Sequence, residues 1–227
     1  MAGTPARGRF ITLEGGEGSG KSTQARLLAE ALTRAGRDTL LTREPGGAPA
    51  AEEIRALLVQ GHIGRWDPLS EALLHYAARR EHLTATIRPA LAAGSWVVCD
   101  RFADSTLAYQ GFGLGVDRGL IALLYERVVE DTAPDLTLIL DLPVDEGLRR
   151  AGGRARLGGA SGEAGAGAET RYERMDPAFH RRLRDGYLEI ARADPRRCVA
   201  IDARPAVESV QAAIRAALRE RLGVAPA

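Results

Sequence analysis

The sequence predicts an α/β fold in which helices cover both faces of a five-stranded parallel sheet. Short apolar runs recur along the chain, and segments with helical periodicity separate them. This alternation is typical of a parallel sheet whose strands are connected by helices. The chain has 227 residues, of which 45% are hydrophobic, so it can bury the core of one domain. We therefore expect one three-layer α/β/α domain over residues 9–227, preceded by a flexible tail over residues 1–8.

The expected strands are the apolar runs, and the expected helices are the amphipathic segments between them. In the helix expected after the first strand, Ala25, Leu28 and Leu32 share one face, and in the last expected helix Val210 and Ile214 do so. We interpret these faces as core. The strands are expected at residues 10–14, 39–42, 96–99, 136–140 and 198–201, and the helices at residues 21–35, 51–61, 68–93, 117–132, 143–151, 177–193 and 206–222.

A complete phosphate-binding motif, Gly-x-x-x-x-Gly-Lys-Ser, connects the first expected strand to the first expected helix. Its glycines let backbone N–H groups turn toward a phosphate, and the following helix directs its positive end at the same anion. Lys21, the one lysine among 31 lysine and arginine residues, is expected to contact the transferred phosphoryl group, and Ser22 to bind magnesium. The motif predicts a P-loop NTPase type of fold and a nucleoside triphosphate site formed by Gly15, Gly16, Glu17, Gly18, Ser19, Gly20, Lys21, Ser22 and Thr23.

Charge and composition limit the expected partners. The formal net charge is +1, which disfavours nucleic acid or a membrane surface as the main partner. No apolar segment approaches the length of a membrane span, and we expect no targeting segment at the start of the sequence. Cys99 and Cys198 lie far apart without metal-type spacing, so we expect buried free thiols and a cytoplasmic protein.

Three further segments lie near the carboxyl ends of expected strands or on a neighbouring helix, where open parallel sheets bind ligands. They read Thr-Arg-Glu-Pro-Gly-Gly at residues 42–47, His-Tyr-Ala-Ala-Arg at 75–79 and Asp-Arg-Phe-Ala-Asp-Ser-Thr-Leu-Ala-Tyr-Gln-Gly at 100–111. Together with the phosphate loop they resemble the thymidylate kinase family, over nearly the whole chain from about Arg9 onward. The resemblance implies transfer of a phosphoryl group from ATP to dTMP, with Mg²⁺, in a homodimer. Another nucleoside monophosphate kinase is the alternative.

The resemblance also implies roles for individual residues. Asp100 and Arg101 end an apolar strand, where the carboxylate would hold magnesium and the guanidinium would bind the acceptor phosphate; a strand-end ion pair is the alternative. Arg79 is expected to donate to the thymine edge, and Glu17 to accept from the sugar hydroxyl. Arg43 has two interpretations of equal weight, a phosphate contact and a structural ion pair. The expected dTMP site comprises Glu17, Arg43, His75, Arg79, Arg101, Ser105, Thr106, Tyr109 and Gln110, and the expected metal ligands are Ser22 and Asp100.

Phosphoryl transfer requires positive charge near the moving group, and we expect an arginine to supply it. No basic residue lies between Gly15 and Gly20, and thymidylate kinases without one there resemble the bacterial subgroup, in which a lid supplies the arginine. The lid is expected at residues 149–174, which contain a low-complexity stretch expected to be a mobile loop. The expected catalytic residues are Lys21, Asp100, Arg101, Arg154 and Arg171.

His75 departs from the family, which usually places phenylalanine at this position to stack on thymine. An imidazole can also stack, but it buries less apolar area and adds polarity. Tyr76 is the alternative stacking residue, after a small rotation of the helix. A metal-binding role for His75 is disfavoured because no second histidine lies at ligand spacing.

Overall fold

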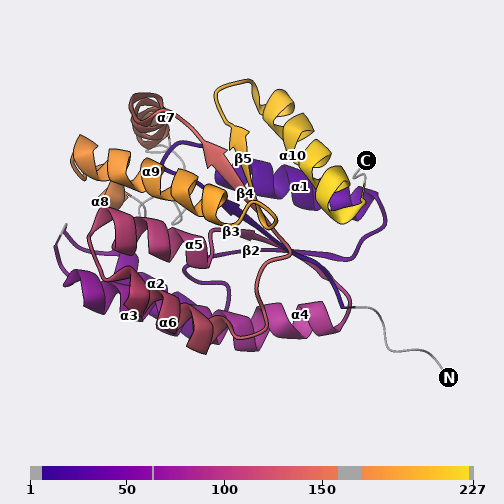
Figure 1. Cartoon of the computed structure of the whole chain (residues 1–227), viewed down its shortest axis with the longest axis horizontal. Helices are drawn as coiled ribbons and strands as arrows, with labels where there is room; N and C mark the ends of the chain where they lie inside the picture. Colours follow the sequence, from indigo (N-terminus) through magenta and orange to yellow (C-terminus); the bar gives the residue numbers. More distant parts are fainter. Residues whose placement is uncertain (1–6, 63, 158–169, 225–227) are drawn as a thin grey trace.

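A five-stranded sheet forms the centre of the computed structural model, which describes residues 7–62, 64–157 and 170–224 (Figure 1). The spatial order of the strands is β2-β3-β1-β4-β5, and all neighbouring strands are parallel. The five-stranded parallel sheet predicted from the sequence is therefore confirmed. The strands are β1 (Phe10–Glu14), β2 (Thr39–Arg43), β3 (Trp96–Asp100), β4 (Leu136–Asp141) and β5 (Cys198–Asp202).

The strands after β1 each end one residue later than predicted, at a charged side chain. These last residues are Arg43, Asp100, Asp141 and Asp202. They remain paired because the parallel ladders continue past the apolar runs: Arg43 lies opposite Asp100, and Asp141 lies opposite Asp202. The carboxyl edge of the sheet is therefore charged, and this is the edge at which open parallel sheets bind ligands.

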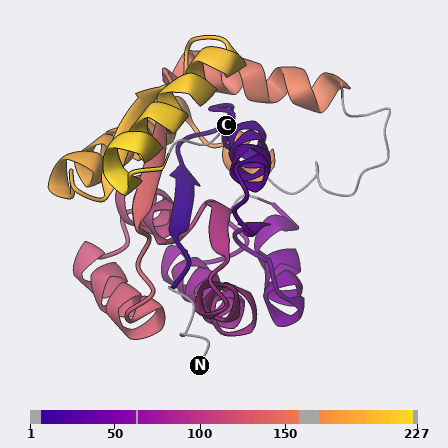
Figure 2. The same ribbon diagram turned by 90° about the vertical axis from the view of Figure 1, so that its right-hand side faces the viewer.

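Helices cover both faces of the sheet, as the two ribbon views show (Figures 1 and 2). On one face, α1 (Lys21–Arg34) and α10 (Val207–Leu222) bury an apolar cluster that includes Leu28 and Ile214. On the other face, Leu83 and Phe102 belong to a second cluster, and Phe179 to a third. The remaining helical segments are α2 (Pro49–Val59), α3 (Pro68–His82), the π-helical η1 (Leu83–Ile87), α4 (Arg88–Ala92), α5 (Ala103–Thr106), the π-helical η2 (Leu107–Gly113), α6 (Arg118–Val129), α7 (Val144–Leu157), α8 (Thr170–Glu173) and α9 (Pro177–Ala193).

The segment 103–113 is helical, although it was not among the expected helices and the start of a capped helix was only the alternative interpretation of Ser105. It consists of α5 and η2 in direct succession. The sequence signal is weak because serine, threonine and glycine are poor helix formers. Tertiary packing stabilises the segment instead: Gly113 lies so close to the ring of Phe179 that an added Cβ would lie 2.4 Å from it. Residues 68–93, predicted as one helix, are divided into α3, η1 and α4 without an interruption.

Two predicted segments lie partly outside the described residues. In the expected tail, residues 1–6 are not described, whereas the backbone N–H of Gly8 donates to the carbonyl of Leu91 at 2.9 Å. In the expected lid, residues 158–169 are not described, and α7 and α8 contain its two flanks. The boundaries of the tail and the lid therefore stay predictions.

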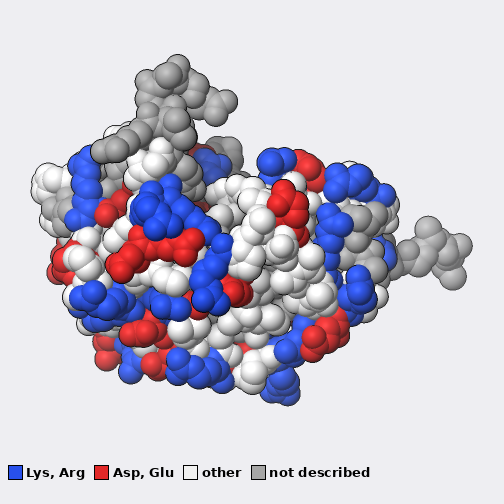
Figure 3. Space-filling model, turned by 90° about the horizontal axis from the view of Figure 1, so that it is seen from above, with Lys and Arg blue, Asp and Glu red and all other residues white. Residues whose placement is uncertain are grey.

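Charged side chains of both signs are intermixed on the face shown in Figure 3. This distribution agrees with the small net charge of +1. Within the described ranges, no helix combines the length and the hydrophobicity that a membrane crossing requires.

The first turn of α7 touches the phosphate loop through two glycines. A Cβ added to Gly18 would lie 2.1 Å from the carbonyl oxygen of Gly147, and a Cβ added to Gly147 would lie 2.5 Å from the carbonyl oxygen of Glu17. Gly18 also has a φ of 69°, in the left-handed region that favours glycine. This close backbone approach holds the loop between β1 and α1 against the helix that follows β4.

We expect Gly147→Ala to lower the free energy of unfolding and to weaken nucleoside triphosphate binding. The added methyl group meets backbone on the loop, and overpacking of this kind costs about 1–3 kcal/mol. Gly152→Ala is the matched control, because it lies on the same helix and its added carbon would have no atom within 4 Å. It should stabilise the protein by up to about 1 kcal/mol, since alanine favours helix more than glycine does. Urea unfolding and nucleotide titration measure both effects, and equal behaviour of the two variants would contradict the contact.

Candidate active site

The phosphate loop has the backbone conformation that its glycines permit. Gly15, Gly18 and Gly20 have φ values of 139°, 69° and 87°. Helix α1 begins directly after Gly20 and has no side-chain cap, so the N–H groups of its first turn point toward the loop. The Lys21 ammonium is buried and donates to the carbonyl of Gly16 at 2.8 Å. The loop therefore presents backbone donors and one cation to the same small volume.

A hydroxyl and a carboxylate meet beside the loop at the ends of α1 and β3. The hydroxyl of Ser22 donates to Oδ2 of Asp100 at 2.5 Å. The other oxygen, Oδ1 of Asp100, is buried and has no hydrogen-bond partner within the described part of the chain. Thr23, the last residue of the predicted triphosphate site, follows Ser22 in α1 and is exposed. The sequence-predicted metal ligands thus lie together, although they are far apart in the chain.

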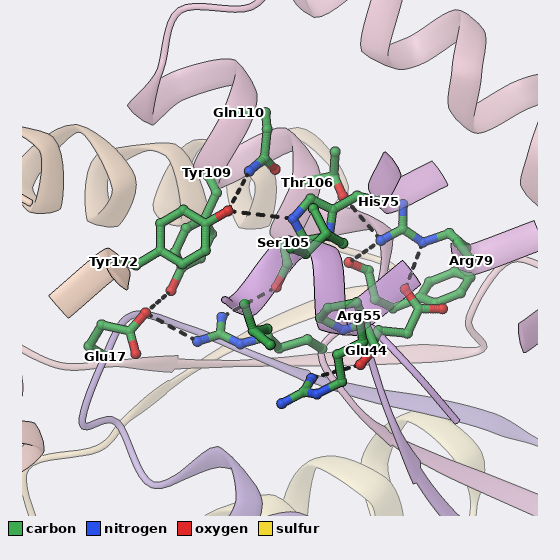
Figure 4. A pocket seen from close by; sticks show the side chains of 15 residues that line it. Glu17, Glu44, Arg55, His75, Arg79, Ser105, Thr106, Tyr109, Gln110 and Tyr172 are labelled. Atoms are coloured by element: carbon green, nitrogen blue, oxygen red, sulfur yellow. Dashed lines mark hydrogen bonds and ion pairs between the residues drawn. The ribbon is translucent and has the colours of Figure 1, made fainter. Parts of the chain in front are cut away.

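A pocket of about 540 Å³, counting the space that opens to solvent, lies next to the loop (Figure 4). Residues from the loop, from α2 and α3, and from α5 and η2 form its walls. Most residues of the predicted dTMP site line it, namely Glu17, His75, Arg79, Arg101, Ser105, Thr106, Tyr109 and Gln110, together with Glu44, Pro45, Arg55, Leu58, Val59, Phe102 and Tyr172.

Arg101 connects the pocket to the phosphate loop. Its φ of 70° is unusual for a residue other than glycine and turns the chain sharply after β3. The buried guanidinium donates from Nη1 to the carbonyl of Gly15 at 3.2 Å and from Nη2 to Glu17 at 3.4 Å. It also lies over the ring of Tyr109, 5.0 Å from the ring centroid. The sharp turn therefore directs Arg101 back toward the loop.

Arg79 is buried and held from several sides. Its Nε donates to Glu44 at 2.8 Å, and its Nη2 donates to the carbonyl of Phe102 at 3.0 Å and to Thr106 at 3.1 Å. Its Nη1 is buried and has no hydrogen-bond partner among the residues that the structure describes. An unsatisfied buried donor in the wall of a pocket is suited to a ligand acceptor, because leaving it unpaired is costly.

Glu17 is buried, and its side chain points away from the phosphate side of the loop. It accepts a hydrogen bond from the hydroxyl of Tyr109 at 2.5 Å and forms an ion pair with Arg101. Burial, above all, raises the pKa of the Tyr109 hydroxyl well above its usual value, so that hydroxyl stays a donor. Glu17 therefore belongs to the loop by sequence and to the pocket by position.

The predicted catalytic residue Arg171 is buried on α8, near the end of the segment predicted as a lid, and belongs to a cluster of polar side chains. Its Nη2 donates to Glu71 on α3 at 2.5 Å, and the neighbouring Tyr172 hydroxyl donates to the same carboxylate at 2.5 Å. The amide nitrogen of Gln110 donates to Glu71 at 2.8 Å. In the structure, Arg171 thus contacts Glu71 and Tyr172, whereas Arg101 contacts the phosphate loop as well as Tyr109 and Ser105. The side chain of Arg154, in the last turns of α7, lies outside the described residues.

His75 lines the pocket as a neutral imidazole. Burial and the nearby guanidiniums of Arg79 and Arg171 lower the pKa of His75 to about 3. Its Nε2 lies 3.5 Å from the hydroxyl of Tyr172. Tyr76, the alternative stacking residue, donates to the carbonyl of Ile121 and lies under the guanidinium of Arg79, and it does not line the pocket.

Arg43 is placed outside the pocket. It is half exposed and pairs with Glu52 of α2 at 3.1 Å, the geometry of a structural ion pair. Arg43 ends β2 and Glu44 follows it, and because successive side chains of an extended backbone point to opposite sides, the buried one is Glu44. Arg55 of α2 lines the pocket instead and donates to the carbonyl of Pro45 at 2.7 Å.

Some pocket residues were not identified from the sequence. Glu44 lies inside the Arg-Glu-Pro-Gly-Gly turn, so its motif was visible although its role as the partner of Arg79 was not. Arg55 belongs to no motif. Neither does Glu71, which does not line the pocket but accepts from Gln110 and Tyr172, two residues that do. The contacts of both depend on how α2 and α3 are packed. Tyr172 follows Arg171, but the sequence does not indicate that α8 reaches the pocket.

Comparisons with known proteins show the family of the chain and its fold. A family model described as thymidylate kinase matches residues 13–214. The chain is 55% identical to a thymidylate kinase of Caulobacter vibrioides over 218 residues, which are 96% of this chain and 99% of that protein. It is 51% identical to a thymidylate kinase of Nitrobacter hamburgensis, with 96% and 91% of the two chains covered. A crystal structure of thymidylate kinase from Ehrlichia chaffeensis is 35% identical and similar in fold with a TM-score of 0.73, covering 93% of this chain and 99% of that one.

We expect His75 to remain neutral in the folded protein between pH 8 and pH 5. Its pKa is about 3 in the fold and near 6.5 in an unfolded chain, so between these values the unfolded state binds the extra proton. The contribution of His75 to stability is therefore complete above about pH 6.5 and is lost progressively as the pH falls toward 3. NMR titration of the imidazole measures this directly. His75→Phe should also make the melting temperature less sensitive to acid, and a His75 resonance with a midpoint near 6.5 would contradict the burial.

Proposed function

The chain belongs to the thymidylate kinase family and transfers the γ-phosphoryl group of ATP to dTMP, and we propose that the transfer takes place between the phosphate loop and the pocket around Arg101. The observation that carries this proposal is the hydrogen bond from Arg101 to the carbonyl of Gly15 at 3.2 Å. It brings a buried guanidinium of the pocket against the backbone of the phosphate loop. The γ-phosphoryl group of ATP on the loop and the phosphate of dTMP on Arg101 would then be neighbours.

We assign the donor phosphates to the loop amides, the N-terminus of α1 and Lys21. The contact of Lys21 with the carbonyl of Gly16 at 2.8 Å shows that its ammonium already points into the loop. A phosphate would offer the ammonium a charged acceptor in place of a neutral carbonyl, and charge-assisted hydrogen bonds are about twice as strong. Glu17 is directed away from this volume and does not repel the phosphates at close range.

We propose that Ser22 and Asp100 bind magnesium. The pair fits the ion because it combines a hydroxyl with a carboxylate whose Oδ1 is buried without a partner among the described residues. No cluster of three or more acidic, histidine or cysteine ligands is found in the described ranges, and Mg²⁺ with a nucleotide needs only one or two carboxylates. When bound, Mg²⁺ neutralises charge on the phosphate oxygens during transfer.

The acceptor is assigned to the walls of the pocket. Arg101 would bind the phosphate, and Arg55 replaces Arg43 as the candidate for a second cation, because Arg55 lines the pocket and Arg43 does not. The unpartnered Nη1 of Arg79 would donate to a carbonyl oxygen of thymine. Glu17 would accept from the sugar hydroxyl. Ser105, Thr106, Tyr109 and Gln110 complete the wall, and the neutral ring of His75 is available for stacking.

Arg101 is also our candidate for stabilising the transferred group, because it is the guanidinium that contacts the phosphate loop in the described part of the chain. Arg171 would first have to leave Glu71, to which it is bound at 2.5 Å in a buried ion pair. Arg171 and Arg154 therefore remain lid candidates that act only after a rearrangement.

We further propose a cytoplasmic homodimer that forms through α2, α3 and α6. These helices lie side by side in Figure 1 and expose large apolar side chains: Leu57 is 41% exposed, Leu73 48% and Leu123 47%. Leu69, one turn before Leu73 on α3, is 40% exposed. Neighbouring exposed leucines of this kind commonly mark a contact with another protein surface. The buried free thiols Cys99 and Cys198 support a reducing compartment.

Arg101→Ala is expected to reduce kcat/KM for dTMP by roughly 10³-fold or more, because it removes the cation between donor and acceptor. Arg80→Ala is the matched control: Arg80 follows Arg79 on α3 but pairs at the surface with Glu130. Removing a surface ion pair should change kcat/KM by less than about fivefold. An ADP-coupled assay with dTMP titrated at fixed ATP measures both variants. Unchanged KM and kcat in Arg101→Ala would contradict the proposal.

Leu73→Asp is expected to shift the protein from dimer to monomer, because it places a charge in the proposed apolar interface. Leu41→Asp serves as the control, since Leu41 is also exposed (43%) but lies on the edge strand β2. Sedimentation velocity of the three proteins at micromolar concentration gives the answer. A native chain that sediments as a monomer, or equal dissociation of both variants, would refute this interface.

A further inference from the structure

Glu14 is a buried carboxylate for which the mechanism above has no use. It is the last residue of β1 and directly precedes the phosphate loop. Its side chain is completely buried in the centre of the protein. A carboxylate at such a position is costly unless several donors surround it.

The donors around Glu14 come from the segment that follows β3 and from α9. Its Oε1 accepts from the backbone N–H of Phe102 at 2.8 Å. Its Oε2 accepts from the hydroxyl of Ser105 at 2.5 Å and from that of Tyr187 on α9 at 3.3 Å. Phe102 and Ser105 belong to the turn and the short helix that follow β3. The carboxylate thus connects the end of β1 with the segment that carries Arg101.

The contact with Phe102 fixes the backbone on which Arg101 depends. The N–H of Arg101 donates to the carbonyl of Leu13 at 2.9 Å, and the next N–H, that of Phe102, donates to the side chain of Glu14. Consecutive residues of β1 therefore hold both amides of the turn in which Arg101 has its φ of 70°. A strained residue of this kind persists only when surrounding contacts determine its conformation.

The contact with Ser105 keeps a second acceptor available to Arg101. Because Ser105 donates its proton to Glu14, its oxygen can accept from Nη1 of Arg101, which lies 3.5 Å away, and from the hydroxyl of Tyr187, which lies 3.0 Å away. A protonated carboxyl or a glutamine amide in place of the carboxylate would direct an O–H or N–H donor at Ser105 and compete for the lone pairs of the Ser105 oxygen. The charge of Glu14 thus also sets the direction of the Ser105 hydroxyl.

We propose that Glu14 is a positioning residue for the phosphorylation of dTMP, which holds the Arg101 turn and the Ser105 hydroxyl in the geometry that binds the acceptor phosphate. This inference rests on the role proposed above for Arg101. Glu14 itself lies behind the pocket wall and does not touch the substrate.

The electrostatic surroundings make this role dependent on pH. Burial raises the pKa of Glu14 to about 7, and the nearby charge of Asp104 on α5 adds to the increase; Ser105, Arg101 and the N–H of Phe102 act in the opposite direction. Tyr187 of α9 also faces it, and burial, above all, raises the pKa of Tyr187 well above its usual value. Arg79, Cys99 and Cys198 interact electrostatically with Glu14 as well. The pKa of Glu14 in the folded protein lies above the value of 4.5 for an exposed glutamate, so the folded state takes up a proton as the pH falls through 7. The free energy of unfolding therefore rises on acidification, whereas the carboxylate that holds the Arg101 turn is lost.

The test is Glu14→Gln in the full chain, with ATP and dTMP kinetics, dTMP titration by calorimetry and thermal unfolding. Glutamine keeps an oxygen for Phe102 but loses the charge. We expect kcat/KM for dTMP to fall roughly 10- to 100-fold at pH 8, the dissociation constant for ATP to change less than about twofold, and the melting temperature to stay equal or rise. The native enzyme should also lose activity between pH 8 and 6 more steeply than the variant. The phosphate of dTMP titrates in both assays, whereas Glu14 titrates only in the native enzyme.

Asp104→Asn provides the second arm. Asp104 pairs with Arg197 at 2.6 Å away from the pocket, and its charge contributes to the raised pKa of Glu14. The variant should move the acid limb of the activity profile to lower pH.

A Glu14→Gln enzyme with native kcat/KM for dTMP would overturn the inference, and so would one that loses ATP affinity and thermal stability together with activity. If Arg101→Ala is inactive while Glu14→Gln keeps the native kcat/KM for dTMP, only the positioning role of Glu14 is wrong. If Arg101→Ala keeps the native kcat/KM, the proposed site itself is wrong.

Discussion

The parallel pairing of β1 with β3 is the constraint on which the site depends. In this register Leu13 lies opposite Asp100, so the chain segments that leave the two strands begin side by side. One segment becomes the phosphate loop, and the other carries Arg101. Slipping the register by one residue would send the side chain of Glu14 to the opposite face of the sheet and separate it from the Phe102 amide. The pairing that stabilises the core therefore also sets the distance between the phosphate loop and the turn that carries Arg101.

Ion pairs hold the buried guanidiniums around the pocket. Arg79 pairs with Glu44, Arg101 with Glu17, and Arg171 with Glu71, each partner coming from a different part of the fold. Pairing offsets much of the cost of removing these charges from water. A guanidinium has five N–H donors, more than one carboxylate occupies, so donors remain for a ligand, as with Nη1 of Arg79. The pocket thus combines a paired, stable interior with positive donors suited to an anionic nucleotide.

The same reasoning separates what could be predicted in the site from what could not. The Ser22 and Asp100 side chains were predicted to act together because each lies in a motif with a defined position at a strand or helix end, and they form a hydrogen bond in the structure. The sequence did not distinguish the two interpretations of Arg43, because its partner Glu52 depends on how α2 packs against the end of β2. Helix α5 and η2 escaped prediction since their stability comes from contacts such as that of Gly113 with Phe179 rather than from local propensity. The roles of the site residues in binding and catalysis remain proposals that the kinetic experiments test.

By itself, the sequence determined the class of fold, the five strands, the phosphate loop and the family, because these depend on local patterns: apolar periodicity, glycine spacing and short motifs. Only the tertiary structure decided which charges meet. Glu71 and Arg171 are 100 positions apart, and Glu17 and Tyr109 are 92 positions apart. The contact of Glu71 with Arg171 depends on the packing of α3 against α8. No motif in the sequence indicates a contact between residues so far apart in the chain. For the same reason Glu14, an ordinary residue at the end of a strand in the sequence, becomes in the fold the carboxylate around which the Arg101 turn is built.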